Sequence, residues 1–190
     1  MFKDIWLISH SPRRQQLLRD LGFDFKVGEA HVEETYPHDL KPQDIPIYLS
    51  QLKADDANVT MTADTLVITA DTIVWAEGRV LGKPDDEQEA KDMLNLLSGM
   101  THQVITGVTL RTQERSRSFS ETTCVTFATL SAEDIDYYVS NYKPLDKAGA
   151  YGIQEWIGMV GVETINGCFY NVMGLPVHRL YKEMKQISDI

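Results

Sequence analysis

Cysteines and long apolar runs are scarce in this 190-residue chain, and each scarcity excludes a class of protein. The two cysteines, Cys124 and Cys168, are far apart in the sequence and have the spacing of neither a disulfide framework nor a zinc site. This usage indicates a reducing compartment, so we expect the protein in the cytoplasm. No stretch approaches the run of about 18 apolar residues that a membrane-spanning helix needs, and Asp4 interrupts the apolar N-terminus. We therefore expect neither a signal peptide nor a membrane partner.

Basic residues are also outnumbered. Lysine and arginine together number 18, against 28 aspartates and glutamates, which gives a formal net charge of −10. A protein that follows the phosphates of DNA or RNA normally carries a basic face, so we expect no nucleic-acid partner. A phosphate site in this chain requires a local basic pocket within an acidic body, which suits a small metal-bound nucleotide better than a polymer.

Three common catalytic motifs are missing as well. The sequence has no Gly-x-x-x-x-Gly-Lys-Ser/Thr phosphate loop and no Gly-x-Gly-x-x-Gly dinucleotide fingerprint. It also lacks the Gly-x-Ser-x-Gly motif of serine hydrolases. Kinase, GTPase, dehydrogenase and serine-hydrolase functions therefore lose support.

Strands and helices alternate along the chain, which predicts an α/β fold. A helix is expected over 12–22, because Ser11 is a good N-cap, Pro12 is favoured at the first helical position and Gly22 ends the pattern. The length fits one large domain or two closely packed lobes. The expected strands cover 5–9, 23–27, 65–77, 102–112 and 117–129, and the last two are expected to form a hairpin. The other expected helices cover 42–59, the stretch from Pro84 to Gly99, 131–142 after a Ser131/Asp134 capping box, and 177–185.

Arg13 and Arg14 follow directly on the expected start of the first helix. Unpaired N–H groups and the positive end of the helix dipole make such a position an anion site. A cation there is unfavourable by about 0.3–1 kcal/mol unless an anion is present, and the planar guanidinium group suits phosphate. The alternative is a capped surface helix with two solvated arginines.

Asp71 lies within the most apolar strand of the chain, where an unpaired carboxylate is very costly. Either the strand opens to a cleft at this point, or a metal ion or a lysine holds the carboxylate. In such a place an aspartate can activate water or bind magnesium. The structural alternative is an aspartate hydrogen-bonded to a neighbouring turn.

Two lysines and two glutamates are further candidates. Lys53 falls on the apolar stripe of its helix, four residues after Leu49, and snorkelling to water is the usual explanation. Lys83 immediately precedes the next helix. Glu33 and Glu34 offer a magnesium ligand or form an exposed acidic loop.

Later segments give weaker signals. Six of the twelve glycines fall within 146–176, which is typical of a segment that wraps a ligand or of an irregular connection with an edge strand. Tyr138, Tyr142 and Trp156 are expected to pack in the interior rather than to stack on a base.

Five motifs together resemble the Maf family of nucleotide pyrophosphatases, in order and spacing from about residue 5 to 185. They are Ser-Pro-Arg-Arg at 11–14, Ala-Asp-Thr at 70–72, Gly-Lys-Pro at 82–84, Asp-Lys-Ala-Gly-Ala-Tyr-Gly-Ile-Gln at 146–154 and Asn-Val-Met-Gly-Leu-Pro at 171–176. The resemblance implies a single domain over residues 1–190. Its α/β fold is related to inosine triphosphatases, with helices flanking a mixed twisted sheet and a cleft between two lobes.

The resemblance also implies an activity and roles for named residues. The activity is hydrolysis of dTTP and UTP to the monophosphate and pyrophosphate, with a divalent cation (Mg or Mn) as cofactor. Asp71 is implied as the proton acceptor and Glu34 as the metal ligand. The implied phosphate-binding residues are Ser11, Arg14, Lys53 and Lys83, and the implied base-selecting residues are Arg13, Thr72 and Gln154.

Two questions stay open at this point. The family has been associated with septum formation, so a nucleotide-binding regulator of cell division with incidental hydrolysis is the alternative function. A homodimer is also open, because one sequence shows no interface.

Overall fold

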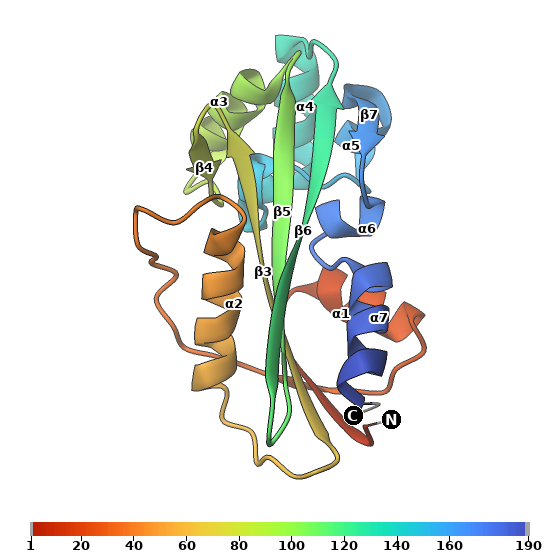
Figure 1. The fold of residues 1–190 in the computed structure, drawn as a ribbon. Coiled ribbons are helices and arrows are strands. Elements are labelled where there is room, and N and C mark those ends of the chain that lie inside the picture. Colours follow the sequence, from red (N-terminus) through yellow and green to blue (C-terminus); the bar gives the residue numbers. More distant parts are fainter. Residues whose placement is uncertain (1, 189–190) are drawn as a thin grey trace. The chain divides into compact units, whose positions relative to one another are not determined.

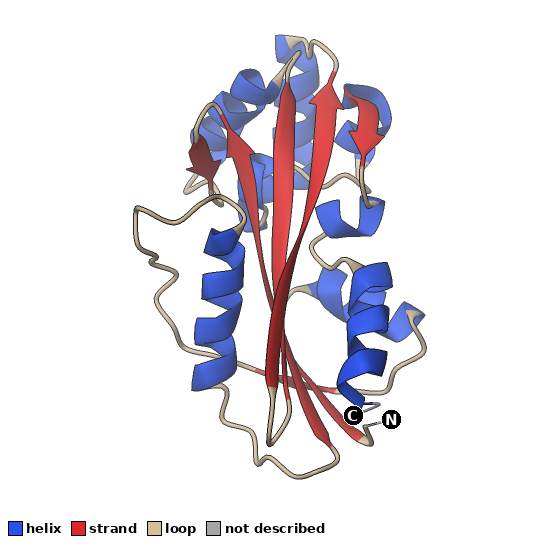
Figure 2. Ribbon diagram, viewed as in Figure 1, coloured by secondary structure: helices blue, strands red, loops and turns tan. Residues whose placement is uncertain are grey.

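The computed structural model describes residues 2–188, which group into two compact units. The first unit consists of the described residues of Met1–Asp71, Thr106–Glu121 and Gly174–Ile190, and the second of Thr72–Ile105 and Thr122–Met173. Helices and strands alternate along the chain (Figure 1), and both units contain both kinds of element (Figure 2). The predicted α/β class is confirmed.

The strands form a seven-stranded sheet in the order β2-β1-β3-β5-β6-β7, with β4 paired to β3. Strand β1 runs parallel to β2 and β3, whereas the β3–β4 and β6–β7 pairs are antiparallel. The sheet is therefore mixed, as expected. Strands β3 (Thr65–Ala76), β5 (Thr101–Arg111) and β6 (Ser116–Phe127) each contribute residues to both units.

Within the first unit, helices flank the strands on two sides, with α2 on one side and α1 and α7 on the other (Figure 1). Residues 65–70 of β3 are fully buried, as expected for a strand covered on both faces. The elements that belong wholly to this unit are β1 (Asp4–Ile8), α1 (Pro12–Asp20), β2 (Lys26–Gly28), α2 (Asp44–Asp56) and α7 (Val177–Ser188).

Helix α1 begins where its sequence predicts and ends at Asp20, two residues before the expected end. The Ser11 side chain accepts a hydrogen bond from the Arg14 backbone N–H, Pro12 occupies the first helical position, and Gly22 has a φ of +82°. The strand expected over 23–27 is wrong at its start, because β2 covers only Lys26–Gly28. Phe23 instead lies outside a strand, where it is half-buried and contacts Tyr181 of α7, with ring centroids 6.3 Å apart.

Helix α2 lies unusually close to β5. A Cβ atom on Gly107 would lie 2.2 Å from the carbonyl carbon of Pro46, so only glycine fits there. The Ser50 hydroxyl lies 2.8 Å from that of Thr109, and Thr69 donates a hydrogen bond to the Ser50 carbonyl at 2.6 Å. These contacts hold α2 against the strands. The helix covers Asp44–Asp56 and is therefore shorter than the expected 42–59.

The second unit has its own apolar core, in which Leu94, Phe127, Ile135 and Ile157 are fully buried. The predicted capping box at Ser131 and Asp134 is present. The elements that belong wholly to this unit are β4 (Arg79–Leu81), α3 (Glu87–Leu97), α4 (Ala132–Tyr142), the 3-10 helices η1 (Pro144–Asp146) and η2 (Ala148–Ala150), α5 (Trp156–Gly161), β7 (Val162–Asn166) and α6 (Phe169–Val172).

The glycine-rich segment contains an edge strand, β7, between short helices, as one of its two interpretations expected. Its contact with a ligand stays a prediction. Tyr138 is fully buried and Trp156 half-buried, whereas Tyr142 is 37% exposed and stacks on Tyr138. Among residues 2–188, no helix is both long and apolar enough to cross a membrane.

Candidate functional site

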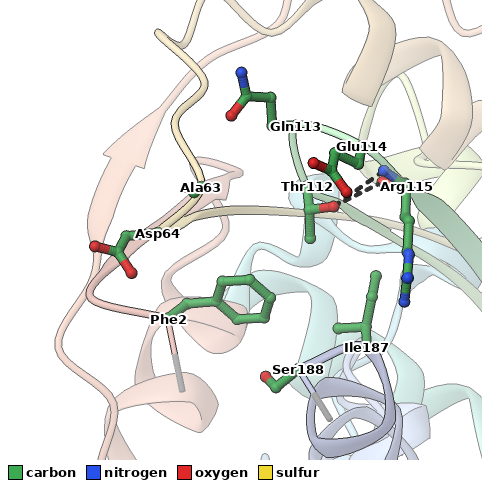
Figure 3. Close-up of a pocket in the computed structure, with 9 residues that line it drawn as sticks. All are labelled: Phe2, Ala63, Asp64, Thr112, Gln113, Glu114, Arg115, Ile187 and Ser188. Carbon is green, nitrogen blue, oxygen red and sulfur yellow. Dashed lines mark hydrogen bonds between the residues drawn. The ribbon is translucent and has the colours of Figure 1, made fainter. Parts of the chain in front are cut away.

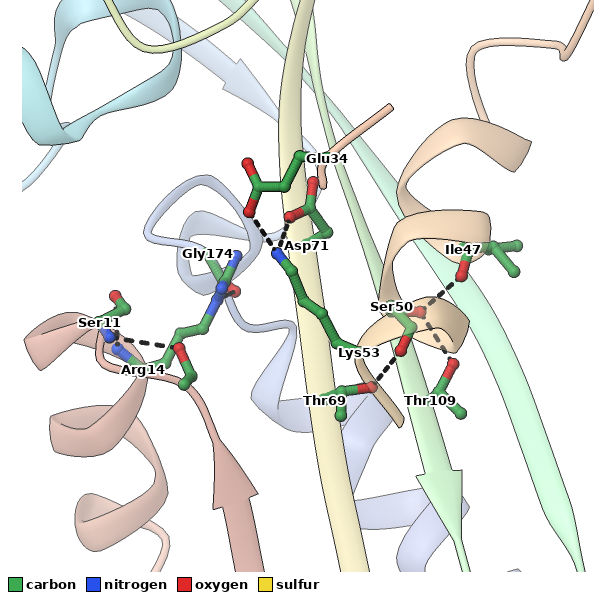
Figure 4. A network of polar contacts seen from close by, with 11 residues as sticks. Ser11, Arg14, Glu34, Ile47, Ser50, Lys53, Thr69, Asp71, Thr109 and Gly174 are labelled. Carbon is green, nitrogen blue, oxygen red and sulfur yellow. Dashed lines mark hydrogen bonds and ion pairs between the residues drawn. The ribbon is translucent and has the colours of Figure 1, made fainter. Parts of the chain in front are cut away.

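Asp71 is the centre of a polar cluster in the first unit (Figure 4). Its side chain, on β3, is only 10% exposed, and its Oδ1 lies 2.5 Å from the Lys53 Nζ. Of the interpretations that the sequence left open, the one in which a lysine holds the carboxylate is confirmed. The ion pair offsets part of the desolvation penalty that an isolated carboxylate would incur in this apolar strand.

Lys53 reaches this position from the last turn of α2, where a cation is favoured by the helix dipole. Its side chain is 14% exposed, and its Nζ also lies 2.7 Å from Glu34 Oε1. The snorkelling interpretation is wrong, because the ammonium group lies between two carboxylates rather than in bulk water.

Glu34 comes from the loop before α2 and remains half-exposed. Its carboxylate and that of Asp71 contact the same nitrogen atom, so the two are close enough to share one small cation. Among residues 2–188, no group of three or more histidine, cysteine, aspartate or glutamate side chains could hold a metal ion. Magnesium is typically held by one or two carboxylates, with water and substrate phosphates as its other ligands, so this pair of oxygen donors fits such an ion.

Arg14 is the second cation of this region. Its Nε donates a hydrogen bond to the Gly174 carbonyl at 2.9 Å, which ties α1 to the segment before α7 (Figure 4). The pKa of Arg14 is lowered mainly by burial; Asp71 opposes this effect, Arg13 adds to it and Glu34 opposes it. The solvated-arginine interpretation is therefore wrong for Arg14, which is anchored within electrostatic range of both acids.

The remaining predicted site residues occupy different places. Arg13 is half-buried beside Arg14 in the first unit. Thr72, Lys83 and Gln154 belong to the second unit, where Thr72 is half-buried on β3 and Lys83 is exposed between β4 and α3. Their membership of one site with Asp71 stays a prediction.

Gln154 is exposed at the tip of a tight turn, which is supported by two buried residues and one half-buried residue. The Glu155 N–H donates to the Gly152 carbonyl at 2.9 Å, which closes the turn. The Tyr138 hydroxyl accepts a hydrogen bond from the Gly152 N–H at 2.9 Å and donates one to Glu155 Oε2. Lys147, whose side chain is 8% exposed, lies 3.2 Å from Glu155 Oε1.

Sequence reasoning missed this network, which we call the brace and define as Tyr138, Lys147 and Glu155. Tyr138 was expected only to pack, and the other two are charged residues in a glycine-rich segment. The available signal in the sequence was a glycine at position 152, three residues before Glu155. In the structure, a Cβ atom on Gly152 would lie 2.8 Å from the Glu155 carboxyl carbon.

A pocket of about 310 Å³ lies elsewhere in the first unit (Figure 3). It adjoins Asp64, which lies seven residue steps of extended chain from Asp71, and these steps correspond to about 23 Å. Arg115 is its single cation, against the acids Asp64 and Glu114, so it is poorly suited to a triphosphate. Its other lining residues are Phe2, Ala63, Thr112, Gln113, Ile187 and Ser188.

The cluster around Asp71 thus combines a buried carboxylate, a second acid and two anchored cations within one unit. Cations of this kind bind phosphate oxygens, while a carboxylate beside them can orient and deprotonate water. The arrangement suits hydrolysis of a small phosphorylated substrate better than binding of a neutral one.

Known proteins resemble this chain in both sequence and fold. A family model described as Maf-like protein matches residues 4–187. A protein of Phocaeicola vulgatus named dTTP/UTP pyrophosphatase is 57% identical over 184 residues, 96% of this chain and 95% of that protein. One of Bacteroides thetaiotaomicron with the same name is 52% identical over the same shares.

Two solved structures share the fold alone. The Ham1 protein of Staphylococcus aureus has a TM-score of 0.51 at 15% identity, covering 98% of this chain and 100% of that one. A HAM1 protein from Coxiella burnetii has a TM-score of 0.50 at 16% identity over the same shares.

Proposed function

This chain belongs to the Maf family, and we propose on that basis that it is a pyrophosphatase that hydrolyses dTTP and UTP to the monophosphate and pyrophosphate. Relatives that bear this activity in their names are more than half identical to the chain over nearly its whole length. The observation that carries the proposal is the buried Asp71 carboxylate held 2.5 Å from Lys53 and within electrostatic range of Arg14.

In the proposed reaction, water attacks the α-phosphorus and pyrophosphate leaves. Asp71 orients the water and accepts its proton, which it later returns to solvent. Burial and the neighbouring Lys53 keep this carboxylate in a fixed position, which favours proton transfer in one geometry.

Ser11, Arg14, Lys53 and Lys83 are proposed to bind the phosphates. The start of α1 supports this assignment, because backbone N–H groups and two arginines meet there at the positive end of a helix. These groups neutralise charge on the phosphate oxygens as the bond to pyrophosphate breaks.

A divalent cation, Mg or Mn, is proposed as the cofactor. Glu34 would hold it, with Asp71 as the second oxygen donor, because both carboxylates already converge on one cationic nitrogen. When bound, such an ion polarises phosphate oxygens and stabilises the charge that develops on them.

Base selection is proposed for Arg13, Thr72 and Gln154. A glutamine amide can donate to O4 and accept from the N3–H of uracil or thymine at the same time, and the exposed position of Gln154 supports contact with a ligand.

We propose further that residues 1–190 act as one catalytic domain. We also propose that the protein is cytoplasmic, because its two cysteines are free. A homodimer remains a proposal without a defined surface.

The test is release of pyrophosphate from dTTP and UTP, with and without added magnesium. We expect turnover above about 1 s⁻¹, which is the low end of the usual range for enzymes. This turnover should depend on the added metal. A regulator of cell division with incidental hydrolysis would instead bind these nucleotides tightly and turn over far more slowly. Release of single phosphates rather than pyrophosphate would contradict the assigned reaction.

A further inference from the structure

Gln154 reaches solvent from a turn whose two ends are tied to the same hydroxyl group. The turn runs from Gly152 to Glu155, with Ile153 buried in the core and Gln154 exposed beside it. The Tyr138 hydroxyl binds the backbone N–H at the first end and the carboxylate at the second. One phenol group thus sets the separation of the two ends.

The charge state of the brace favours a rigid arrangement. Burial raises the pKa of Tyr138 well above its usual value, and Glu155 raises it further, so the phenol keeps its proton and donates it to the carboxylate. Lys147 approaches the other oxygen of Glu155 at 3.2 Å and also lies 2.7 Å from Asp146. Both oxygens of the Glu155 carboxylate are therefore occupied.

Glycine at position 152 completes the arrangement. A Cβ atom there would lie 2.8 Å from the carboxyl carbon of Glu155 and 2.9 Å from its Oε2. The carboxylate consequently packs directly against the backbone of the turn.

We propose that Tyr138, Glu155 and Lys147 are positioning residues for base selection, which act by fixing the orientation of Gln154. The inference rests on the proposed function, because it assumes that Gln154 reads the pyrimidine edge. A glutamine on a loose turn would sample many orientations and lose hydrogen-bond geometry on binding. The brace therefore affects which base is preferred rather than the chemistry at the phosphate.

The test compares UTP with CTP, which differ only at the edge of the base that Gln154 is proposed to read. We expect Tyr138→Phe, which keeps the buried ring and deletes the hydroxyl, to lower the UTP:CTP ratio of kcat/KM about fivefold, the effect of losing one or two neutral hydrogen bonds. The loss should appear mainly as a higher KM for UTP. The ratio does not depend on the fraction of folded enzyme, so destabilisation alone leaves it unchanged.

Tyr151→Phe is the matched control. Tyr151 is also buried in the second unit and its hydroxyl lies 2.7 Å from His102, but that bond does not bridge the turn. We expect its UTP:CTP ratio to equal that of the parent protein. Glu155→Gln provides a second variant, whose amide oxygen still accepts from Tyr138 but no longer pairs with Lys147, and we expect a smaller fall in the ratio.

A double substitution separates the two possible failures. If Tyr138 acts through Gln154, Tyr138→Phe has no further effect on the ratio in a Gln154→Ala background. If Tyr138→Phe lowers the ratio just as much in the Gln154→Ala background, the positioning role is overturned. The role is also overturned if Gln154→Ala lowers the UTP:CTP ratio but Tyr138→Phe and Glu155→Gln leave it unchanged. An unchanged ratio in Gln154→Ala rejects the proposed base contact itself, and the brace then has nothing to position.

Discussion

The two units handle polar groups in opposite ways. In the first, the groups proposed for chemistry are themselves withdrawn from solvent, with the Asp71 and Lys53 side chains 10% and 14% exposed. In the second, the proposed base reader Gln154 is exposed, while its supporting residues Tyr138 and Lys147 are buried and Glu155 is half-buried. The difference matches the two tasks, because proton transfer benefits from fixed charges in a dry environment, whereas base recognition requires a side chain that reaches the ligand.

The substitution Asp71→Asn is the strongest test of the buried charges in the first unit. Asparagine keeps the shape but cannot accept a proton, so we expect kcat for dTTP to fall about 10²–10³-fold, while KM changes little. Steady-state pyrophosphate release measures both constants. Asp64→Asn, at a largely exposed aspartate just before β3, is the control and should leave kcat unaltered. Equal turnover in Asp71→Asn and the parent protein would remove the general-base assignment.

The interior of the second unit should tolerate charge poorly. Burial lowers the pKa of His102 from 6.5 to about 4, and its ring is fully enclosed beside Phe127 and Tyr151. Between these pH values the unfolded chain binds the proton and the folded chain does not, so stability is full above pH 6.5 and is lost as the pH falls towards 4. The loss amounts to about 3 kcal/mol.

Urea unfolding at several pH values measures this dependence. We expect His102→Gln to flatten the fall in unfolding free energy between pH 6.5 and 4. His178→Gln, at an exposed histidine of the first unit, should keep the slope of the parent protein. Identical slopes for all three proteins would show that His102 takes up its proton without unfolding.

Packing beneath the buried charges can be tested through Gly107. The methyl group of Gly107→Ala would meet the backbone of Pro46 and push α2, which carries Lys53, away from the strands. We expect a loss of about 2 kcal/mol in unfolding free energy together with a lower kcat. Gly82→Ala, where a Cβ atom meets nothing within 4 Å, is the control for stability and should change it by less than about 0.5 kcal/mol. Equal urea midpoints for the two variants would mean that α2 adjusts without cost.

Substitution of Gln154 tests the exposed half of the comparison. Gln154→Glu replaces a group that both donates and accepts by one that only accepts, so we expect the preference for UTP over GTP to fall about tenfold. Competition between the two nucleotides in one assay measures the ratio directly. A ratio that does not change would reject a base-reading role for this residue, whatever its effect on kcat.

The buried half of the site was predictable because its residues are anomalous where they stand. A carboxylate in an apolar strand and a lysine on an apolar helical stripe each demand an explanation, so Asp71 and Lys53 stood out individually. Their pairing did not follow from the residues, since eighteen positions separate them. The contact of Glu34 with Lys53 was not predictable either, because composition favoured an exposed acidic loop.

The fold was predictable where local rules suffice. Ser11, Pro12 and Gly22 define α1 by capping and turn chemistry alone, and the Ser131/Asp134 box defines the start of α4. The start of β2 and the brace were not predictable, because they depend on side chains that meet only after folding: Phe23 against α7, and Tyr138 of α4 against the turn at Gly152.

The boundaries between the two units limit the order in which the chain can fold during synthesis. Because they fall inside three strands and before Gly174, no contiguous stretch of chain contains one unit without part of the other. Neither unit can therefore be inherited or transplanted as a module. During synthesis the first unit is completed only by its last segment, which supplies the carbonyl that anchors Arg14. This arginine therefore reaches its final position only after nearly the whole chain has been made.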